Sequence, residues 1–220
     1  MRYVHKTSTP KFFIKDTKHL KSWKKYKSHK KRDLKQHILD KEQNHLCIYC
    51  ESKISLDNSH IEHLRPKDEV RYPQLLFVYR NLTVSCNGLC HVFDNKLTPL
   101  SCGHIKGNEF DKNMFLNPVE LRDIRDYFVY DFDTYEMKPS LKNPIKAKYM
   151  ISTLLHLNDE GLRYARRIAL RNFNKKMYQI KDKESRKKRM IEVLNRENIA
   201  FISFLRYKYR HLLKSALQDM

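Results

Sequence analysis

The sequence predicts an α+β fold in which a small cysteine-rich core is embedded in a mainly α-helical chain. Two observations lead to this prediction. All five cysteines and three of the four glycines lie between residues 46 and 118, a composition typical of loops with short strands. Outside this region, apolar residues recur at helical spacing among many lysines and arginines. We therefore divide the chain into a basic N-terminal helical segment (1–45), a zinc-stapled core (46–118) and a C-terminal helical region (119–220).

The N-terminal segment is predicted to contain a helix from about Lys18 to Gln43. Leu34 and Ile38 stand four residues apart, and no glycine or proline interrupts the stretch. Trp23 lies among lysines, which is compatible with stacking on nucleic-acid bases. We nevertheless expect Trp23 to pack in the interior, because it is the only tryptophan of the chain.

The core is predicted to contain short strands at SHIEHL (Ser59–Leu64) and LLFVY (Leu75–Tyr79). Little regular apolar periodicity surrounds these strands, so the region needs an additional source of stability. A structural metal ion supplies it readily in a reduced protein. We therefore expect several of the cysteines to bind a metal ion.

The C-terminal region is predicted to contain two helices that form a hairpin, packed on the core or on a partner. An apolar stripe marks the first helix, at Leu162, Ala165, Ala169, Phe173, Met177 and Ile180. The polar stretch 182–189 is expected to interrupt the helices. A second apolar stripe then runs from Met190 to Ala216 with one polar gap.

The charge of the chain points to a polyanionic partner. Lysine and arginine outnumber aspartate and glutamate by 45 to 25, which gives a formal net charge of +20. Nucleic acid is the leading candidate partner and a membrane surface the second. No apolar run is long enough to span a bilayer, and the N-terminus lacks the apolar segment of a secretory signal. We expect a cytoplasmic protein that uses its cysteines as metal ligands rather than in disulfides.

The cysteine spacing predicts a structural zinc site. CIYC, Cys47 to Cys50, is a pair that can bind one tetrahedral zinc ion. Three arrangements remain open for the second half of the site. The first is Cys86 with Cys102, the second is Cys86 with Cys90, and the third is a site that includes His91.

Four further residues have side chains suited to phosphodiester hydrolysis: Glu62, His63, Asn81 and His104. A neutral imidazole can deprotonate water near pH 7. A carboxylate and an imidazole together can hold a divalent ion that polarises a phosphoryl oxygen. An asparagine amide can orient the histidine that acts as the base.

These motifs together resemble those of the HNH endonucleases. CIYC, SHIEHLRPK, RNLTVSC and CGHIKGN occur in the order of that family, and EQNHLCIYCESKI, IEHLRPK and CGHIKGN resemble its retron- and Septu-associated PtuB-like branch. The resemblance implies a ββα-metal core with a structural Zn²⁺ and a catalytic Mg²⁺ or another divalent ion. It implies these roles: His63 as general base, Glu62 and His104 as ligands of the catalytic ion, Asn81 as the orienting amide, and Cys47, Cys50, Cys86 and Cys102 as zinc ligands.

The sequence departs from the HNH pattern in two places. Gly103 stands where the last ligand of the catalytic ion usually follows the final cysteine, so Asn108 is an alternative to His104. A fifteen-residue insertion, Asn87 to Ser101, separates Cys86 from Cys102 and makes Cys90 a competitor for the zinc ion.

The resemblance implies a nuclease that cleaves DNA, RNA or tRNA as the effector of an antiviral defence system of the Septu or retron type. The implied partners are a PtuA-like ATPase of the ABC/SMC type, and in some systems a retron reverse transcriptase with its small DNA. The alternative is a zinc-stapled module that binds nucleic acid without cutting it.

Three neighbouring residues are left with open roles. His60 is either exposed or donates a hydrogen bond to a side chain that binds the catalytic ion. Arg65 either pairs with Glu62 or contacts phosphate. Lys106 either lies near a phosphate or faces solvent.

Overall fold

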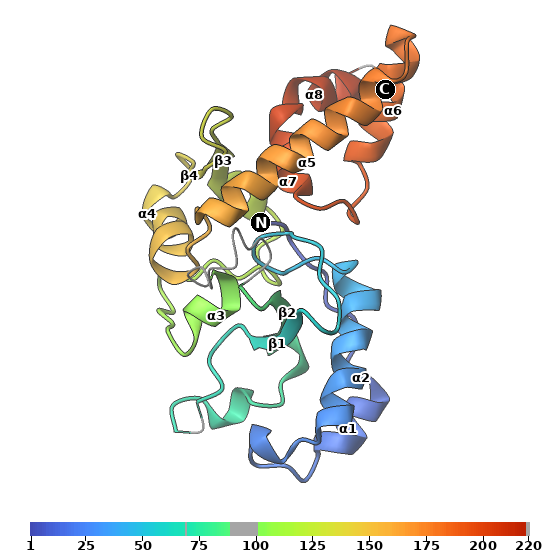
Figure 1. Cartoon of the computed structure of the whole chain (residues 1–220). Helices are drawn as coiled ribbons and strands as arrows, with labels where there is room; N and C mark the ends of the chain where they lie inside the picture. The colour runs from blue at the N-terminus through green and yellow to red at the C-terminus, as the bar shows by residue number, and fades with distance from the viewer. Residues whose placement is uncertain (69, 89–100, 219–220) are drawn as a thin grey trace.

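The protein has a mixed α+β fold, as the sequence predicts, and the described residues form two small antiparallel sheets. The computed structural model describes residues 1–68, 70–88 and 101–218. In these residues, one sheet pairs β1 (Ser59–His63) with β2 (Leu82–Cys86), and the other pairs β3 (Phe128–Tyr130) with β4 (Met137–Pro139). Helices surround both sheets (Figure 1).

The N-terminal segment begins with several short helices instead of the long helix predicted from Lys18. It contains α1 (Lys11–Thr17), the 3-10 turn Trp23–Lys25 and α2 (Ser28–Ile38), which continues as a π-helical turn, Leu39–Gln43. The prediction was wrong because Ser22 and Tyr26 have extended backbone conformations and limit the turn between them to Trp23–Lys25. Trp23 and Tyr26 are both buried, with their ring centroids 5.4 Å apart. The expected interior position of Trp23 is confirmed.

The strand predicted at SHIEHL is confirmed as β1, but the strand predicted at LLFVY is wrong. The apolar run instead joins two 3-10 turns, Pro73–Leu75 and Tyr79–Asn81. Leu76 and Tyr79 are buried three residues apart, whereas Val78 is exposed, which is the spacing of a turn rather than of a strand. The partner of β1 is β2, and Ser59 pairs with Cys86 while His63 pairs with Leu82.

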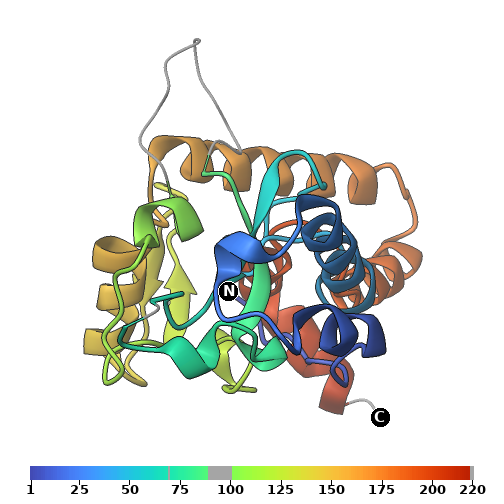
Figure 2. The same cartoon turned by 90° about the horizontal axis from the view of Figure 1, so that it is seen from below.

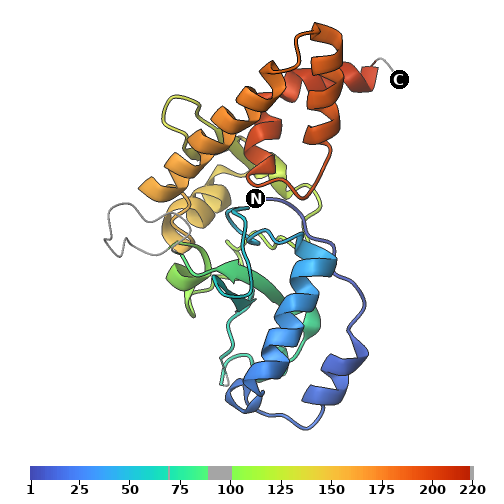
Figure 3. The ribbon, with the colours of Figure 1, turned by 45° about the vertical axis from the view of Figure 1, so that its right-hand side comes forward.

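The short helix α3 (Cys102–Lys106) packs next to this strand pair. Its position is fixed at its start, where Ser85 Oγ on β2 accepts a hydrogen bond from the Gly103 amide (3.1 Å). The Cys102 amide donates to the carbonyl oxygen of Leu155 (2.8 Å). Figures 1 and 3 show α2 and α3 on opposite sides of the pair β1–β2. This arrangement leaves β1 between two helices.

The C-terminal region contains more helices than the predicted hairpin. After β4 come α4 (Pro144–Lys148), a π-helical turn (Tyr149–Leu154), α5 (Glu160–Tyr178), α6 (Lys183–Leu194), α7 (Ile202–Lys208) and α8 (Arg210–Gln218). The apolar stripe predicted for the first helix is confirmed in α5, which buries Leu162, Phe173 and Met177. Figure 2 shows α5 running along one side of the molecule from α4 toward α6.

The expected interruption at residues 182–189 is wrong, since most of this stretch lies in α6. Asp182 caps that helix by accepting a hydrogen bond from the Ser185 amide (2.7 Å), and the lysines and arginines that follow are good helix formers. The second predicted helix is broken instead at Phe201, which has the left-handed conformation (φ 55°) immediately before α7.

Glu51 connects the C-terminal helices to the cysteine region. Its buried carboxylate accepts hydrogen bonds from the amide (2.8 Å) and the hydroxyl (2.5 Å) of Ser203 on α7, and the N-terminal amine lies 3.3 Å away. Three distant parts of the chain therefore meet at the Glu51 side chain. The division of the chain into residues 1–45, 46–118 and 119–220 stays a prediction. No helix in the described part of the chain is both long and apolar enough to cross a membrane.

Candidate active site

Four cysteines converge in the interior beside the strand pair. Cys47, Cys50, Cys86 and Cys102 are buried, and their sulfur atoms all lie within 4.8 Å of one another. The sulfurs of Cys50 and Cys86 are 3.9 Å apart. Four thiolates bound to zinc at about 2.3 Å in tetrahedral geometry stand about 3.8 Å apart. The cluster could therefore hold a metal ion such as zinc. Among the described residues, these four cysteines are the group of three or more His, Cys, Asp or Glu side chains whose ligand atoms all lie within 4.8 Å of one another.

The second half of this cluster consists of Cys86 and Cys102, one of the arrangements that the spacing left open. Cys86 ends β2, and Cys102 begins α3. The competing residues, Cys90 and His91, lie outside the described part of the chain. The Cys86 amide also donates a hydrogen bond to the sulfur of Cys47 (3.3 Å), a contact that favours a thiolate.

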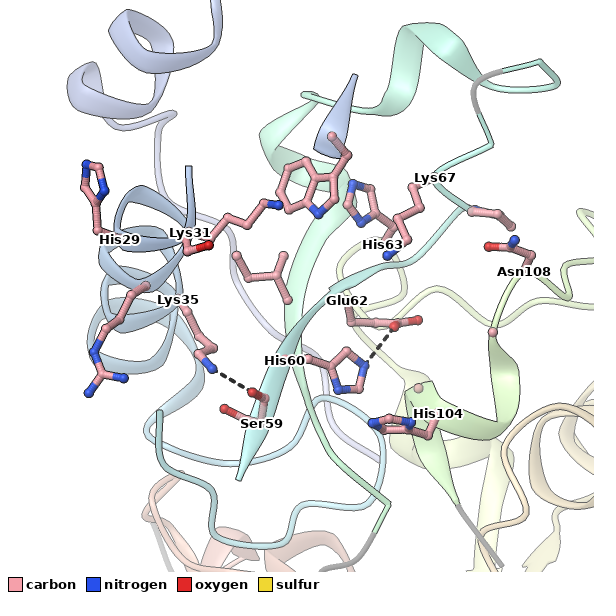
Figure 4. A pocket seen from close by; sticks show the side chains of 17 residues that line it. His29, Lys31, Lys35, Ser59, His60, Glu62, His63, Lys67, His104 and Asn108 are labelled. Carbon is pink, nitrogen blue, oxygen red and sulfur yellow. Dashed lines mark hydrogen bonds and ion pairs between the residues drawn. The ribbon is translucent and has the colours of Figure 1, made fainter. Parts of the chain in front are cut away.

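A pocket of about 790 Å³ lies beside the cysteine cluster and runs over β1 from α2 to α3. His60, Glu62 and His63 on β1 line it, together with Gly103 and His104 on α3. Successive residues of a strand point to opposite faces, so His60 and Glu62 share one face and His63 lies on the other. All three reach one pocket, since β1 is an edge strand of a two-stranded sheet (Figure 4).

Glu62 is held as a carboxylate in the interior. Its Oε1 accepts a hydrogen bond from the hydroxyl of Tyr49 (2.9 Å) and lies 2.9 Å from Nζ of Lys106. Its Oε2 lies 3.4 Å from Nε2 of His60. Burial opposes ionisation, but the charge of Lys106 and the hydrogen bonds from His60 and Lys106 outweigh it and hold the pKa of Glu62 below its ordinary value.

His63 is buried and presents one basic nitrogen. Its Nε2 lies 3.1 Å from the carbonyl oxygen of Leu76. A carbonyl can only accept a hydrogen bond, so Nε2 carries the proton and Nδ1 keeps its lone pair. The ring contacts Trp23 edge to face, with centroids 4.5 Å apart. Burial lowers the pKa of His63 to about 4, so the imidazole is neutral at pH 7.

Asn81 is tied to the loop that supports His63, rather than to the imidazole itself. Its side chain accepts a hydrogen bond from the Arg65 amide (2.8 Å) and donates to the carbonyl oxygens of Arg65 (2.9 Å) and Leu75 (3.3 Å). Leu75 precedes Leu76, whose carbonyl oxygen holds the His63 ring. Asn81 therefore acts on the histidine through the backbone of this loop.

His104 and Asn108 lie on the α3 side of the pocket, and both are exposed. The ring of His104 is 4.9 Å from the ring of His60, centroid to centroid, in an edge-to-face arrangement. Desolvation and the charge of His60 lower the pKa of His104. One carboxylate and two imidazoles therefore gather at this end of the pocket, and this set of donor atoms suits a divalent metal ion.

Two of the neighbouring residues differ from the sequence expectations. Arg65 pairs with the exposed Glu120 (3.7 Å) rather than with Glu62, and its contact with a phosphate stays a prediction. Lys106 does not face solvent or a phosphate. It is buried, and its Nζ contacts Glu62 and donates to the carbonyl oxygen of His63 (3.0 Å). The reason is that α3 packs directly against the strand pair, so its last turn points inward.

Sequence reasoning missed three contacts of the site. Tyr49, inside CIYC, bonds to Glu62; Trp23 packs on His63; and His60 faces Glu62. Only the contact of His60 had a signal in the sequence, because residues two apart on a strand share a face. The other two contacts depend on how distant segments pack.

Comparison with known proteins supports the resemblance to HNH endonucleases. No protein-family model matches the chain. It is similar to a curated protein of Vibrio cholerae serotype O1 biovar El Tor, named "Retron Vc95 putative HNH endonuclease", with 33% identity over 129 residues. The matched part covers 57% of this chain and only 58% of the length of that protein. This similarity supports an HNH endonuclease family for the chain.

Proposed function

We propose that the protein is a metal-dependent HNH endonuclease with a ββα-metal core, stapled by a structural Zn²⁺ on Cys47, Cys50, Cys86 and Cys102. The core would consist of β1, β2 and α3. The observation that carries the proposal is the convergence of Glu62, His63 and His104 in one pocket between α2 and α3. These are the residues that the motif order assigned to the chemistry.

His63 serves as the general base. Its Nδ1 holds the free lone pair, and the Leu76 carbonyl fixes the ring in this orientation. Burial keeps the imidazole unprotonated at pH 7, so it can accept a proton from a water molecule directed at the phosphorus. Asn81 keeps the Leu75–Leu76 backbone in place and so positions the base.

Glu62 and His104 would hold a Mg²⁺ or another divalent ion, with Asn108 as the alternative to His104. Such an ion would neutralise charge on the scissile phosphate and on the leaving oxygen. Lys106 and Tyr49 occupy Oε1 of Glu62 and leave Oε2 facing the pocket. The protein thus orients one oxygen of the carboxylate toward the ion.

The charges that line the pocket support a nucleic-acid substrate. Lys31, Arg32 and Lys35 line it from α2, and Lys67 lines it from the loop after β1 (Figure 4). Burial lowers the pKa of Lys31, and repulsion between its ammonium group and that of Lys67 lowers it further. A phosphate between them would relieve this repulsion. DNA is the first candidate substrate, with RNA and tRNA as alternatives.

We propose a role in antiviral defence of the retron or Septu type, within the PtuB-like branch that the motifs resemble. The similarity to a protein named as part of a retron supports the retron context. A nuclease of this kind needs control in its host. We propose a PtuA-like ABC/SMC-type ATPase as the controlling partner, with a retron reverse transcriptase and its small DNA where these are co-encoded. Such a system would act in the cytoplasm.

The test is a cleavage assay on DNA, total RNA and tRNA with Mg²⁺ or Mn²⁺, with and without the co-encoded ATPase. His63→Ala should abolish cleavage while zinc content, folding and nucleic-acid binding persist. The matched control is His29→Ala, which removes another histidine from the same pocket on α2 and should leave cleavage within about threefold. If His63→Ala still cleaves, the assigned chemistry is wrong. Binding without cleavage by the wild type would favour the binding module.

A further inference from the structure

His60 has the contacts of a metal ligand rather than of a bystander. Its Nε2 lies 3.4 Å from Oε2 of Glu62, and the two side chains leave β1 on the same face (Figure 4). The other ring nitrogen, Nδ1, lies 3.3 Å from the side-chain oxygen of Asn87. An amide oxygen accepts hydrogen bonds, so Nδ1 can donate its proton to Asn87, and Nε2 is then the nitrogen that faces Glu62.

Without a metal ion, His60 Nε2 can share a proton with the Glu62 carboxylate. When a cation takes the place of that proton, Nε2 and Oε2 are two electron-pair donors that face each other. Oε2 of Glu62 is the carboxylate oxygen that Tyr49 and Lys106 leave toward the pocket, since both of them bind Oε1. Neighbouring ligands of an octahedral ion, bound at about 2.0–2.2 Å with an angle of about 90° between them, lie about 2.8–3.1 Å apart. The observed 3.4 Å between Nε2 and Oε2 is only a few tenths of an ångström longer, so a small movement of the two side chains would bring them to this separation.

Gly103 provides the space for this pair. A Cβ atom at position 103 would lie 2.7 Å from Glu62 Oε2 and 2.7 Å from His60 Nε2. Any side chain there would displace both donor atoms. The next residue, His104, brings a second imidazole to within 4.9 Å of the His60 ring. Because the His104 side chain is exposed, its nitrogens have room to turn toward the pair.

We propose that His60 Nε2 binds the divalent ion directly, together with Glu62 Oε2 and the His104 imidazole. The inference rests on the proposed function for the existence of this ion and adds a ligand and a metal preference. Two imidazoles and one carboxylate suit Mn²⁺ and other transition ions better than Mg²⁺, which prefers oxygen ligands. The site should therefore bind Mn²⁺ more tightly than Mg²⁺.

Metal binding itself provides the test, without any substrate. Mn²⁺ and Mg²⁺ are titrated into the zinc-loaded full chain by calorimetry, and bound Mn²⁺ is examined by pulsed electron paramagnetic resonance for coupling to ¹⁴N. The wild type should show two coupled imidazole nitrogens. His60→Ala should leave one and weaken Mn²⁺ binding more than about tenfold. Gly103→Ala, which removes no ligand, should also weaken Mn²⁺ binding.

Controls separate this inference from the nuclease proposal. His29→Ala removes a pocket histidine from α2 and should bind Mn²⁺ within about twofold of the wild type. Glu62→Gln should weaken Mn²⁺ binding whether or not His60 is a ligand.

If Glu62→Gln weakens Mn²⁺ binding but His60→Ala changes neither affinity nor the ¹⁴N coupling, His60 is no ligand, and the nuclease proposal is untouched. If metal binding behaves as expected but no substrate is cleaved, the metal site stands and the nuclease proposal fails. His60→Gln, with circular dichroism and zinc content as checks, covers the case in which His60→Ala does not fold.

Discussion

Nζ of Lys106, at the end of α3, lies 2.9 Å from Oε1 of Glu62 on β1, and both side chains are buried. The same ammonium group donates to the carbonyl oxygen of His63. One lysine thus joins the helix to the strand that carries two of the candidate catalytic residues. It also compensates the charge of the carboxylate in the interior, where an unpaired charge is strongly unfavourable.

Lys106→Met is therefore expected to destabilise the protein. It leaves the Glu62 carboxylate buried without its cation, and removing one partner of a buried ion pair costs about 3–5 kcal/mol. The measurement is urea unfolding of the zinc-loaded protein at pH 7 without added Mg²⁺ or Mn²⁺. Arg65→Met is the matched control, because its pair with Glu120 is exposed and worth less than about 1 kcal/mol. Equal losses in the two variants would contradict the structural role of Lys106.

Asn81→Ala is expected to lower kcat more than about tenfold with little change in KM. The variant loses the hydrogen bonds to Arg65 and Leu75, so the Leu76 carbonyl no longer holds the His63 ring in one orientation. The NMR signal of the His63 Nε2 proton should weaken or shift in parallel. Asn58→Ala, which removes a loop-capping bond to the Ser55 amide (2.6 Å), should leave kcat unchanged. An unaltered His63 signal in Asn81→Ala would rule out the positioning role.

Cleavage is expected to persist at mildly acidic pH. The neutral imidazole is the active form of His63, and burial lowers its pKa from the ordinary value to about 4. The base therefore stays competent as the pH falls through 6.5, and a cation bound at the neighbouring Glu62 would shift the pKa in the same direction. The profile of kcat/KM between pH 5 and 8, with zinc content checked at each end, measures this. An acid limb centred near pH 6.5 would mean that His63 is not a buried base.

Zinc binding is expected to depend on Cys47 but not on Cys90. Cys47→Ser removes one of the four converging sulfurs, so the zinc content should fall and the protein should melt at a markedly lower temperature. Cys90→Ser should leave one zinc ion per chain. Native mass spectrometry gives the metal content, and calorimetry gives the melting temperature. Loss of zinc in Cys90→Ser would show that Cys90, rather than Cys86 or Cys102, completes the site.

The strand β1 shows how far the sequence alone could go. SHIEHL is a short segment that was predicted to be a strand, and on a strand His60 and Glu62 share a face because they are two residues apart. LLFVY contains more residues of high β-propensity, yet it joins two 3-10 turns, because burial of Leu76 and Tyr79 overrides local preference. Similarly, α5 follows from its stripe, whereas the break at Phe201 depends on its packing beside Glu51.

The sequence by itself determined the chemical character of the protein: a strongly basic chain, cysteines at metal-binding spacing, and Glu62 and His63 side by side on a strand. These properties are written in residue type and short-range spacing, which do not depend on the rest of the fold. Only the tertiary structure decided that Cys86 and Cys102 meet Cys47 and Cys50, that Lys106 turns inward to Glu62, and that His60 and Gly103 come together. Each of these contacts joins segments that are far apart along the chain or lie on different elements, and packing around a shared core sets the distances between them.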